Sequence, residues 1–116
     1  PTDIAYINLH GTATPLNDAM ESRVIAGLFG RETPCGSTKG MTGHMLGGTG
    51  GVEAAFLCLS LTEGRLPPHV WDGQADPTLP PLNFAAPGQT FVQRAMLSNS
   101  FGFGGSNVAL VLGLPR

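Results

Sequence analysis

The apolar positions of the chain fall into runs whose length and spacing predict alternating strands and helices. Residues 4–9, IAYINL, are short, apolar and partly β-branched, which predicts a buried strand. The Asn17-Asp18 pair precedes a stretch with apolar residues at helical spacing, and Gly30 is expected to end that helix. Residues 33–40, TPCGSTKG, fit a short strand or loop.

The second half of the chain repeats this alternation. Residues 41–64 pass from a glycine-rich stretch into a helix that Gly64 ends, and because residues 52–61 are almost wholly apolar, we expect this helix to be buried on most sides, with Cys58 in the core. A long, ordered, proline-rich surface loop follows, with room for a short strand. Two strands, 91–100 and 108–114, are joined by the glycine-rich turn FGFGGSN. The order of elements predicts an α/β layer.

Composition narrows the class of protein. Only 12% of the residues are charged and the net charge is −2, so there is no basic surface for nucleic acid. The chain could be a small, weakly charged domain. The low share of charged residues, and the start at Pro1 instead of Met, favour instead a fragment of a larger protein that buries part of its surface against a missing partner. No apolar stretch is long enough to span a membrane. Cys35 and Cys58 show no metal-ligand spacing and need no oxidising compartment, so we expect a cytoplasmic protein without a metal site.

Two of the three histidines stand at junctions between predicted elements, where α/β proteins place reactive side chains. His10 follows the first strand in LHGT, and His44 lies in TGHM. Lys39, the only lysine of the chain, lies five residues before His44. We interpret His10, Lys39 and His44 as one constellation. His69, in the proline-rich segment LPPHVWDG, is expected to be an ordinary surface residue.

Lys39 is either a surface lysine or a buried one, and a buried lysine needs a carboxylate. Glu53 is the natural partner, because it interrupts the apolar run GGVEAAFLCL, where an unpaired charge is costly. Asp18 and Glu21, near the start of the first helix, are expected to join this network. None of these side chains is a nucleophile, and Cys35 lies in no helix N-terminal turn that would activate its thiol.

With these residues identified, the chain resembles the C-terminal half of β-ketoacyl-acyl carrier protein synthases, the elongating condensing enzymes of the thiolase superfamily. The resemblance rests on the ordered segments NLHGTATPLNDAMES, GSTKGMTGHMLGGTGGVEAA and LSNSFGFGGSNVALVL. It implies a thiolase-like α/β fold with a mixed sheet, part of a layered αβαβα enzyme, with residues 1–116 as the C-terminal domain and the N-terminal half absent.

The resemblance also implies roles for individual residues. His10 and His44 match the two catalytic histidines, which promote loss of CO₂ from the malonyl thioester and stabilise the enolate. Lys39 matches the active-site lysine, Glu53 its carboxylate partner, and Asp18 and Glu21 the supporting network. The residues that correspond to contacts of the phosphopantetheine arm and of the acyl group are Thr12, Thr14, Phe101, Gly102 and the gating Phe103.

Some components of the family's site are expected outside this chain. The nucleophilic cysteine would precede Pro1, so the chain alone is expected to be inactive. The resemblance implies no cofactor beyond the phosphopantetheine arm of the carrier, and it implies acyl carrier protein, the missing N-terminal half and a dimer mate, identical or not, as partners. Loop residues His69 and Trp71 depart from the family pattern and favour a polyketide or aryl-polyene branch over housekeeping fatty acid synthesis.

Two other functions remain open. Partner subunits of the chain-length-factor type keep this fold without the cysteine and shape the acyl pocket, but they generally lose site histidines that this chain retains. A thiolase-like acyl-CoA enzyme would carry its second histidine in a Gly-His-Pro setting, whereas Met45 follows His44 here.

Overall fold

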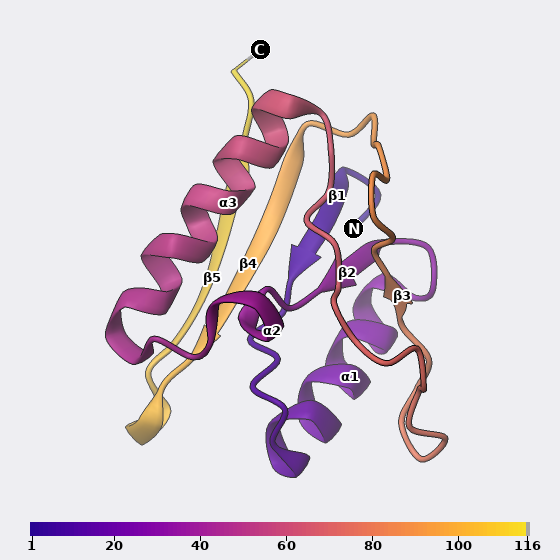
Figure 1. Ribbon diagram of the computed structural model, residues 1–116, viewed down its shortest axis with the longest axis vertical. Helices are drawn as coiled ribbons and strands as arrows, with labels where there is room; N and C mark the ends of the chain where they lie inside the picture. The colour runs from indigo at the N-terminus through magenta and orange to yellow at the C-terminus, as the bar shows by residue number, and fades with distance from the viewer. Residues whose placement is uncertain (116) are drawn as a thin grey trace.

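A computed structural model describes residues 1–115 as a five-stranded sheet with helices on both faces. The strand order is β3-β2-β1-β4-β5, with β1 to β4 parallel and β5 antiparallel to β4, and Figure 1 shows this order across the sheet. The elements in chain order are β1 (Ile4–Asn8), α1 (Pro15–Phe29), β2 (Pro34–Gly36), α2 (Lys39–Thr42), a 3₁₀ turn (Leu46–Gly48), α3 (Thr49–Glu63), β3 (Asn83–Phe84), β4 (Ala95–Phe101), a second 3₁₀ turn (Phe103–Gly105) and β5 (Asn107–Gly113).

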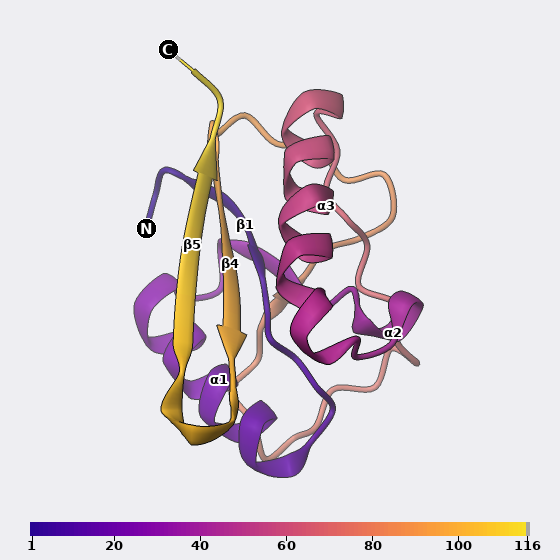
Figure 2. The same cartoon turned by 90° about the vertical axis from the view of Figure 1, so that its left-hand side faces the viewer.

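The two long helices cover opposite faces of the sheet. Figure 2, which views the sheet along its edge, shows α3 on one side of the strands and α1 on the other. Alternating residues of β1 serve the two faces: Tyr6 packs with Leu57 and Leu61 of α3, and Ile7 packs with Ile25 of α1. The strand that leads to His10 is therefore buried on both sides, as expected from its apolar sequence.

The ends of the helices follow local backbone chemistry. Helix α1 begins at Pro15, two residues before the Asn17-Asp18 pair, because the fixed φ of proline suits the first helical turn. Gly30 (φ 65°) and Gly64 (φ 70°) end α1 and α3 as the sequence indicates. The single-turn helix α2 was not expected from the pattern. Strand β4 begins at Ala95 and not at residue 91.

The expectation that α3 is buried on most sides is wrong. The helix meets the sheet with one face, and its buried residues are Thr49, Glu53, Leu57, Ser60 and Leu61. Cys58 is exposed, not in the core, because it lies on the opposite face of the helix. The apolar run therefore reflects two apolar faces, of which this chain covers only one.

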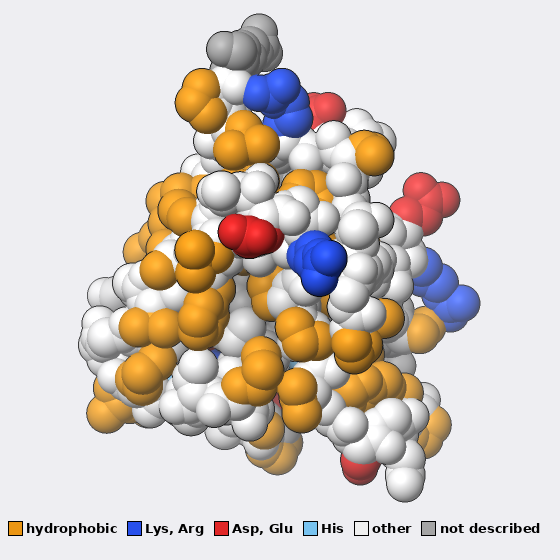
Figure 3. Space-filling model, turned by 45° about the horizontal axis from the view of Figure 1, so that its top comes forward, with side chains coloured by type: hydrophobic (Ala, Val, Ile, Leu, Met, Phe, Trp, Pro, Cys, Tyr) orange, Lys and Arg blue, Asp and Glu red, His pale blue; other side chains and the backbone are white. Residues whose placement is uncertain are grey.

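Apolar surface is also left open elsewhere. Strand β5 is exposed along most of its length, including Val108, Leu110 and Val111. Figure 3 shows hydrophobic side chains over much of one face, with few charged side chains among them. Within residues 1–115, no helix is both long and apolar enough to cross a bilayer.

A substitution of Gly11 tests the close contact between the loop after β1 and the loop after β2. Gly11 has a φ of +43°, and a Cβ there would lie 2.6 Å from Ser37 Cβ. We therefore expect Gly11→Ala to destabilise the fold by roughly 1–3 kcal/mol. Thermal unfolding measures the effect, with Gly27→Ala as the matched control: Gly27 lies inside α1 with open space at its Cβ position, so alanine should stabilise by roughly 0.5–1 kcal/mol. Equal melting of the two variants would contradict this packing.

Candidate active site

The predicted site residues converge at the carboxyl ends of β1 and β4. His10, Thr12 and Thr14 follow β1, and Phe101, Gly102 and Phe103 lie at the end of β4 and in the turn after it. All six line one cavity of about 700 Å³, together with His44. This is the edge of a parallel sheet at which α/β proteins place ligands.

The two histidines lie next to each other on the lining of this cavity, in an edge-to-face arrangement. Their ring centroids are 5.7 Å apart with planes at 89°, and the His10 ring is also 5.4 Å from that of Phe101. His10 is buried, whereas His44 is exposed at the rim. Both imidazoles can therefore reach one small group bound beside them in the cavity.

The ring nitrogens are not equivalent. His44 Nδ1 lies 3.4 Å from the Thr49 hydroxyl, and a neutral imidazole that accepts this bond carries its proton on Nε2. His10 Nδ1 is buried without a hydrogen-bond partner among the described residues, so Nε2 is the nitrogen that remains to face the cavity. Each histidine can thus offer an Nε2 proton to a ligand.

Lys39 and Glu53 form the buried pair that the sequence suggests. Lys39 Nζ lies 2.5 Å from Glu53 Oε1, and both side chains are nearly inaccessible to solvent. Lys39 starts α2, and Glu53 projects from the sheet-facing side of α3. The pair links the loop after β2 to α3 and places the Lys39 ammonium close enough to His10 to act on it.

This charge acts on His10. Burial lowers the pKa of the His10 imidazole, and Lys39 and then His44 lower it further, while Asp18 opposes them weakly. Since the lowered pKa favours the uncharged ring near neutral pH, His10 is held as a neutral hydrogen-bond donor and not as a cation.

Among the described residues, Asp18 and Glu21 make no hydrogen bond or ion pair with Lys39 or Glu53, which pair with each other. Asp18 and Glu21 lie on α1, which covers the opposite face of the sheet from α3. Glu21 instead accepts the backbone amides of His10 at 2.8 Å and Gly11 at 2.9 Å. It therefore fixes the His10 loop through its backbone. Asp18 accepts a hydrogen bond from the Asn17 side chain.

The backbone around the cavity is strained at two non-glycine positions. Ala13 (φ 59°) stands between Thr12 and Thr14, whose hydroxyls lie 2.9 Å apart, and Leu46 (φ 51°) follows the His44 segment. Left-handed conformations cost free energy for alanine and leucine and persist where the surroundings enforce them, most often at functional sites. Leu46 lines the cavity itself, and Ala13 stands between two residues that line it.

The turn after β4 differs from expectation in one detail. Phe103 is 99% exposed at its tip, which suits a residue that can move over the cavity. The Gly102 amide, however, already donates to the Ser106 carbonyl at 2.8 Å. It is therefore not free to bind an acyl group, although Gly102 lines the cavity.

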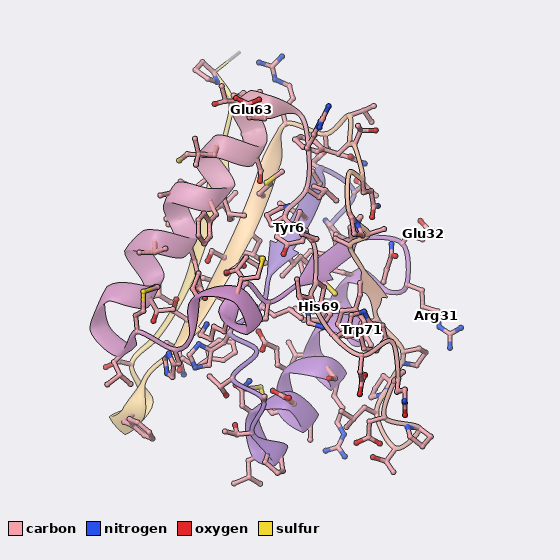
Figure 4. The ribbon with its side chains drawn as sticks, in the orientation of Figure 1. Tyr6, Arg31, Glu32, Glu63, His69 and Trp71 are labelled. Atoms are coloured by element: carbon pink, nitrogen blue, oxygen red, sulfur yellow. The ribbon has the colours of Figure 1, made fainter. Side chains whose placement is uncertain are left out.

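His69 is not the surface residue that the sequence indicated. Its ring is half-buried and stacks on Phe84, with centroids 4.2 Å apart and planes at 15°, and its Nδ1 accepts the Ser37 amide at 3.1 Å. Figure 4 shows His69 and Trp71 next to each other beside β3. The sequence around His69 could not show this contact, because it depends on the short strand β3, which brings Phe84 against the ring.

Neither cysteine belongs to the cavity with the histidines. Cys35 is buried in β2, and burial raises the pKa of its thiol to about 12. Cys58 is exposed on the outer face of α3. The described residues also hold no group of three or more His, Cys, Asp or Glu side chains placed to bind a metal.

Comparison with known proteins assigns this arrangement to a family. Residues 1–71 match the model of the C-terminal domain of beta-ketoacyl synthases, and the chain belongs to that family. It is 44% identical over 115 residues to the 3-oxoacyl-[acyl-carrier-protein] synthase 2 of Synechocystis sp. and 40% identical over 114 residues to that of Staphylococcus aureus. These alignments cover 95% and 96% of this chain but only 27% and 28% of the relatives.

Solved structures give the same result and show that the fold is thiolase-like. The chain matches a ketosynthase, ApeO, in complex with its chain length factor, ApeC, from Xenorhabdus doucetiae, with a TM-score of 0.93 and 46% identity over 99% of this chain and 29% of that one. A ketosynthase/chain length factor named for ishigamide matches with a TM-score of 0.90 and 30% identity, again over 99% of this chain and 29% of that one.

Glu53→Gln tests the buried pair. The amide leaves the Lys39 ammonium without a counter-charge, so we expect a loss of roughly 3–5 kcal/mol of unfolding free energy. Chemical denaturation measures it, with Glu63→Gln as the control, since Glu63 is exposed at the far end of the same helix. Wild-type stability of the Glu53 variant would mean that the pair does not form.

Proposed function

We propose that this chain provides the decarboxylation side of the active site of a β-ketoacyl-carrier protein synthase, an acyltransferase that condenses a malonyl thioester with an acyl thioester. The observation that carries the proposal is the pair of imidazoles, with ring centroids 5.7 Å apart, that line one cavity, with the buried Lys39–Glu53 pair acting on His10. Membership of the beta-ketoacyl synthase family supports it.

The chemistry requires stabilisation of a developing oxyanion. When the bond between the malonyl α-carbon and its carboxylate breaks, CO₂ leaves and the electron pair forms the enolate of the thioester. The Nε2 protons of His10 and His44 then donate to the enolate oxygen. The enolate carbon attacks the acyl thioester carbonyl and expels the thiolate that carried the acyl chain. Fixed donors of this kind contribute about 10²–10³ each to the rate.

The other site residues bind and position the substrate. The hydroxyls of Thr12 and Thr14, 2.9 Å apart on the cavity wall, suit the amide groups of a phosphopantetheine arm. Phe101 packs beside His10, and Phe103 at the exposed turn serves as the gate of the acyl pocket. Burial is the main cause that lowers the pKa of His10, and Lys39, which is paired with Glu53, adds to it.

The acyl acceptor is proposed to come from outside this chain. Cys35 is buried with a raised pKa and Cys58 lies on the outer face of α3, so neither can hold an acyl group against the enolate. We therefore expect residues 1–116 alone to be inactive in condensation. The chain spans little more than a quarter of its curated relatives, and the complete protein would supply a nucleophilic cysteine and the remaining wall of the pocket.

The partners follow from the chemistry. An acyl carrier protein would deliver the malonyl group, and a second subunit, identical or related, would complete a dimer. A pathway of the polyketide or aryl-polyene type is favoured over primary fatty acid synthesis by the His69 and Trp71 loop and by the similarity to ketosynthases that were solved with chain length factors.

A second candidate function is a non-catalytic subunit of the chain-length-factor type. The similarity to ketosynthase/chain length factor structures favours it. The retained set of His10, Lys39 and His44, joined in one site, argues for the catalytic subunit. The two functions differ in one readout, since a pocket-shaping subunit would release no CO₂ from malonyl-carrier protein.

His44→Ala in the complete protein tests the proposed role. Removal of one of the two oxyanion donors should slow CO₂ release from malonyl-carrier protein by about 10²–10³, while loading of the acyl group persists. Met20→Ala, an exposed change on α1 outside the cavity, is the control and should retain wild-type rates of both steps. Unchanged decarboxylation in the His44 variant would contradict the assigned role.

A further inference from the structure

His69 is tied to the loop after β2 by contacts that the proposed mechanism does not use. Its backbone amide donates to the Ala85 carbonyl at 3.1 Å, and its ring stacks on Phe84, with the Trp71 ring centroid 5.7 Å away. A Cβ at Gly36 would lie 3.1 Å from His69 Cβ, so the loop is closely packed against β2. These contacts fix the ring with its Nδ1 toward Ser37.

Ser37 connects His69 to Gly11, the residue after His10, and to Lys39. Its amide donates to His69 Nδ1 at 3.1 Å, and its hydroxyl donates to the Gly11 carbonyl at 2.9 Å. The same hydroxyl oxygen accepts the Lys39 amide at 3.3 Å. Ser37 therefore joins the His10 loop to Lys39.

We propose that His69 is a positioning residue: its neutral imidazole accepts the Ser37 amide and, through the Ser37 hydroxyl, holds the His10 loop and Lys39 in register. The inference deepens the proposed function and rests on it for its kinetic consequence. The contact itself, however, stands on the hydrogen bonds and on the stacked ring, which do not depend on the reaction.

The contact requires an unprotonated Nδ1. A protonated imidazole presents N–H groups at both nitrogens, so it would direct an N–H at the Ser37 amide. Burial lowers the pKa of His69 and protects the acceptor, whereas the carboxylate of Asp18 on α1 acts in the opposite direction. Asp18 and Glu21 are the charged residues of α1 that line, together with His69, a cavity of about 300 Å³. The contact should therefore weaken as the pH falls.

Two substitutions of His69 separate the hydrogen bond from the ring. His69→Phe keeps an aromatic ring over Phe84 but removes the acceptor, and His69→Asn loses the ring but places an amide oxygen near the position of Nδ1. Trp71→Phe is the control, because it alters the same aromatic cluster without touching the Ser37 bond.

The first readout is amide hydrogen exchange of the segment 34–42 in the complete protein, which needs no activity. We expect exchange at Ser37 to be at least about tenfold faster in His69→Phe, and close to wild type in His69→Asn and Trp71→Phe. Wild-type exchange should also accelerate as the pH is lowered, after correction for intrinsic rates. Unchanged protection in His69→Phe would overturn the proposal.

The second readout is CO₂ release from malonyl-carrier protein. His69→Phe should lower kcat about tenfold with KM within about twofold, and His69→Asn should recover kcat to within about threefold of wild type. If both variants lose activity equally and in proportion to their melting temperatures, the ring stack and not the acceptor matters, and the proposal fails. A wild-type protein that releases no CO₂ would refute the proposed function, and the exchange measurement would then decide the role of His69 alone.

Discussion

A buried carboxylate must be paired with an opposite charge or with several hydrogen-bond donors. Two buried carboxylates hold the candidate site in place. Glu53 on α3 is paired with Lys39, and Glu21 on α1 accepts the amides of His10 and Gly11. The two helices lie on opposite faces of the sheet, so Glu21 fixes the loop after β1 from one face and Glu53 fixes Lys39, after β2, from the other. The loops that carry the site are thereby fixed by the helices that form the core.

The two carboxylates have different consequences for the chemistry. Glu21 accepts backbone amides and thereby fixes the position of the His10 backbone, from which the imidazole projects. Within residues 1–115, it forms no ion pair with a charged side chain of the site. Glu53 allows a cation to be buried near His10, and that cation helps to keep the imidazole neutral. A neutral imidazole beside a second histidine is a pair of hydrogen-bond donors, which is what a developing enolate requires.

Much of this arrangement could be predicted from the sequence, for reasons that differ between residues. Glu53 was recognisable because a charge in an apolar helix needs a partner, and the residues around His10 and His44 resemble a known family. Glu21 could not be assigned, because its closest partners are backbone amides in a turn whose shape depends on Gly11. Cys58 was misplaced because an apolar helix gives no sign of how many of its faces one chain covers, and His69 because its contact depends on the pairing of β3 with β2.

The most direct test of the account is the protonation state of His10, measured by ¹⁵N NMR of labelled histidine in the complete protein across a pH series. We expect a neutral ring with its proton on Nε2 at pH 7, and a titration midpoint below the ordinary value of 6.5, because burial and Lys39 lower the pKa. A ring that is charged at pH 7, or that titrates at or above 6.5, would contradict the claim that His10 acts as a neutral oxyanion donor.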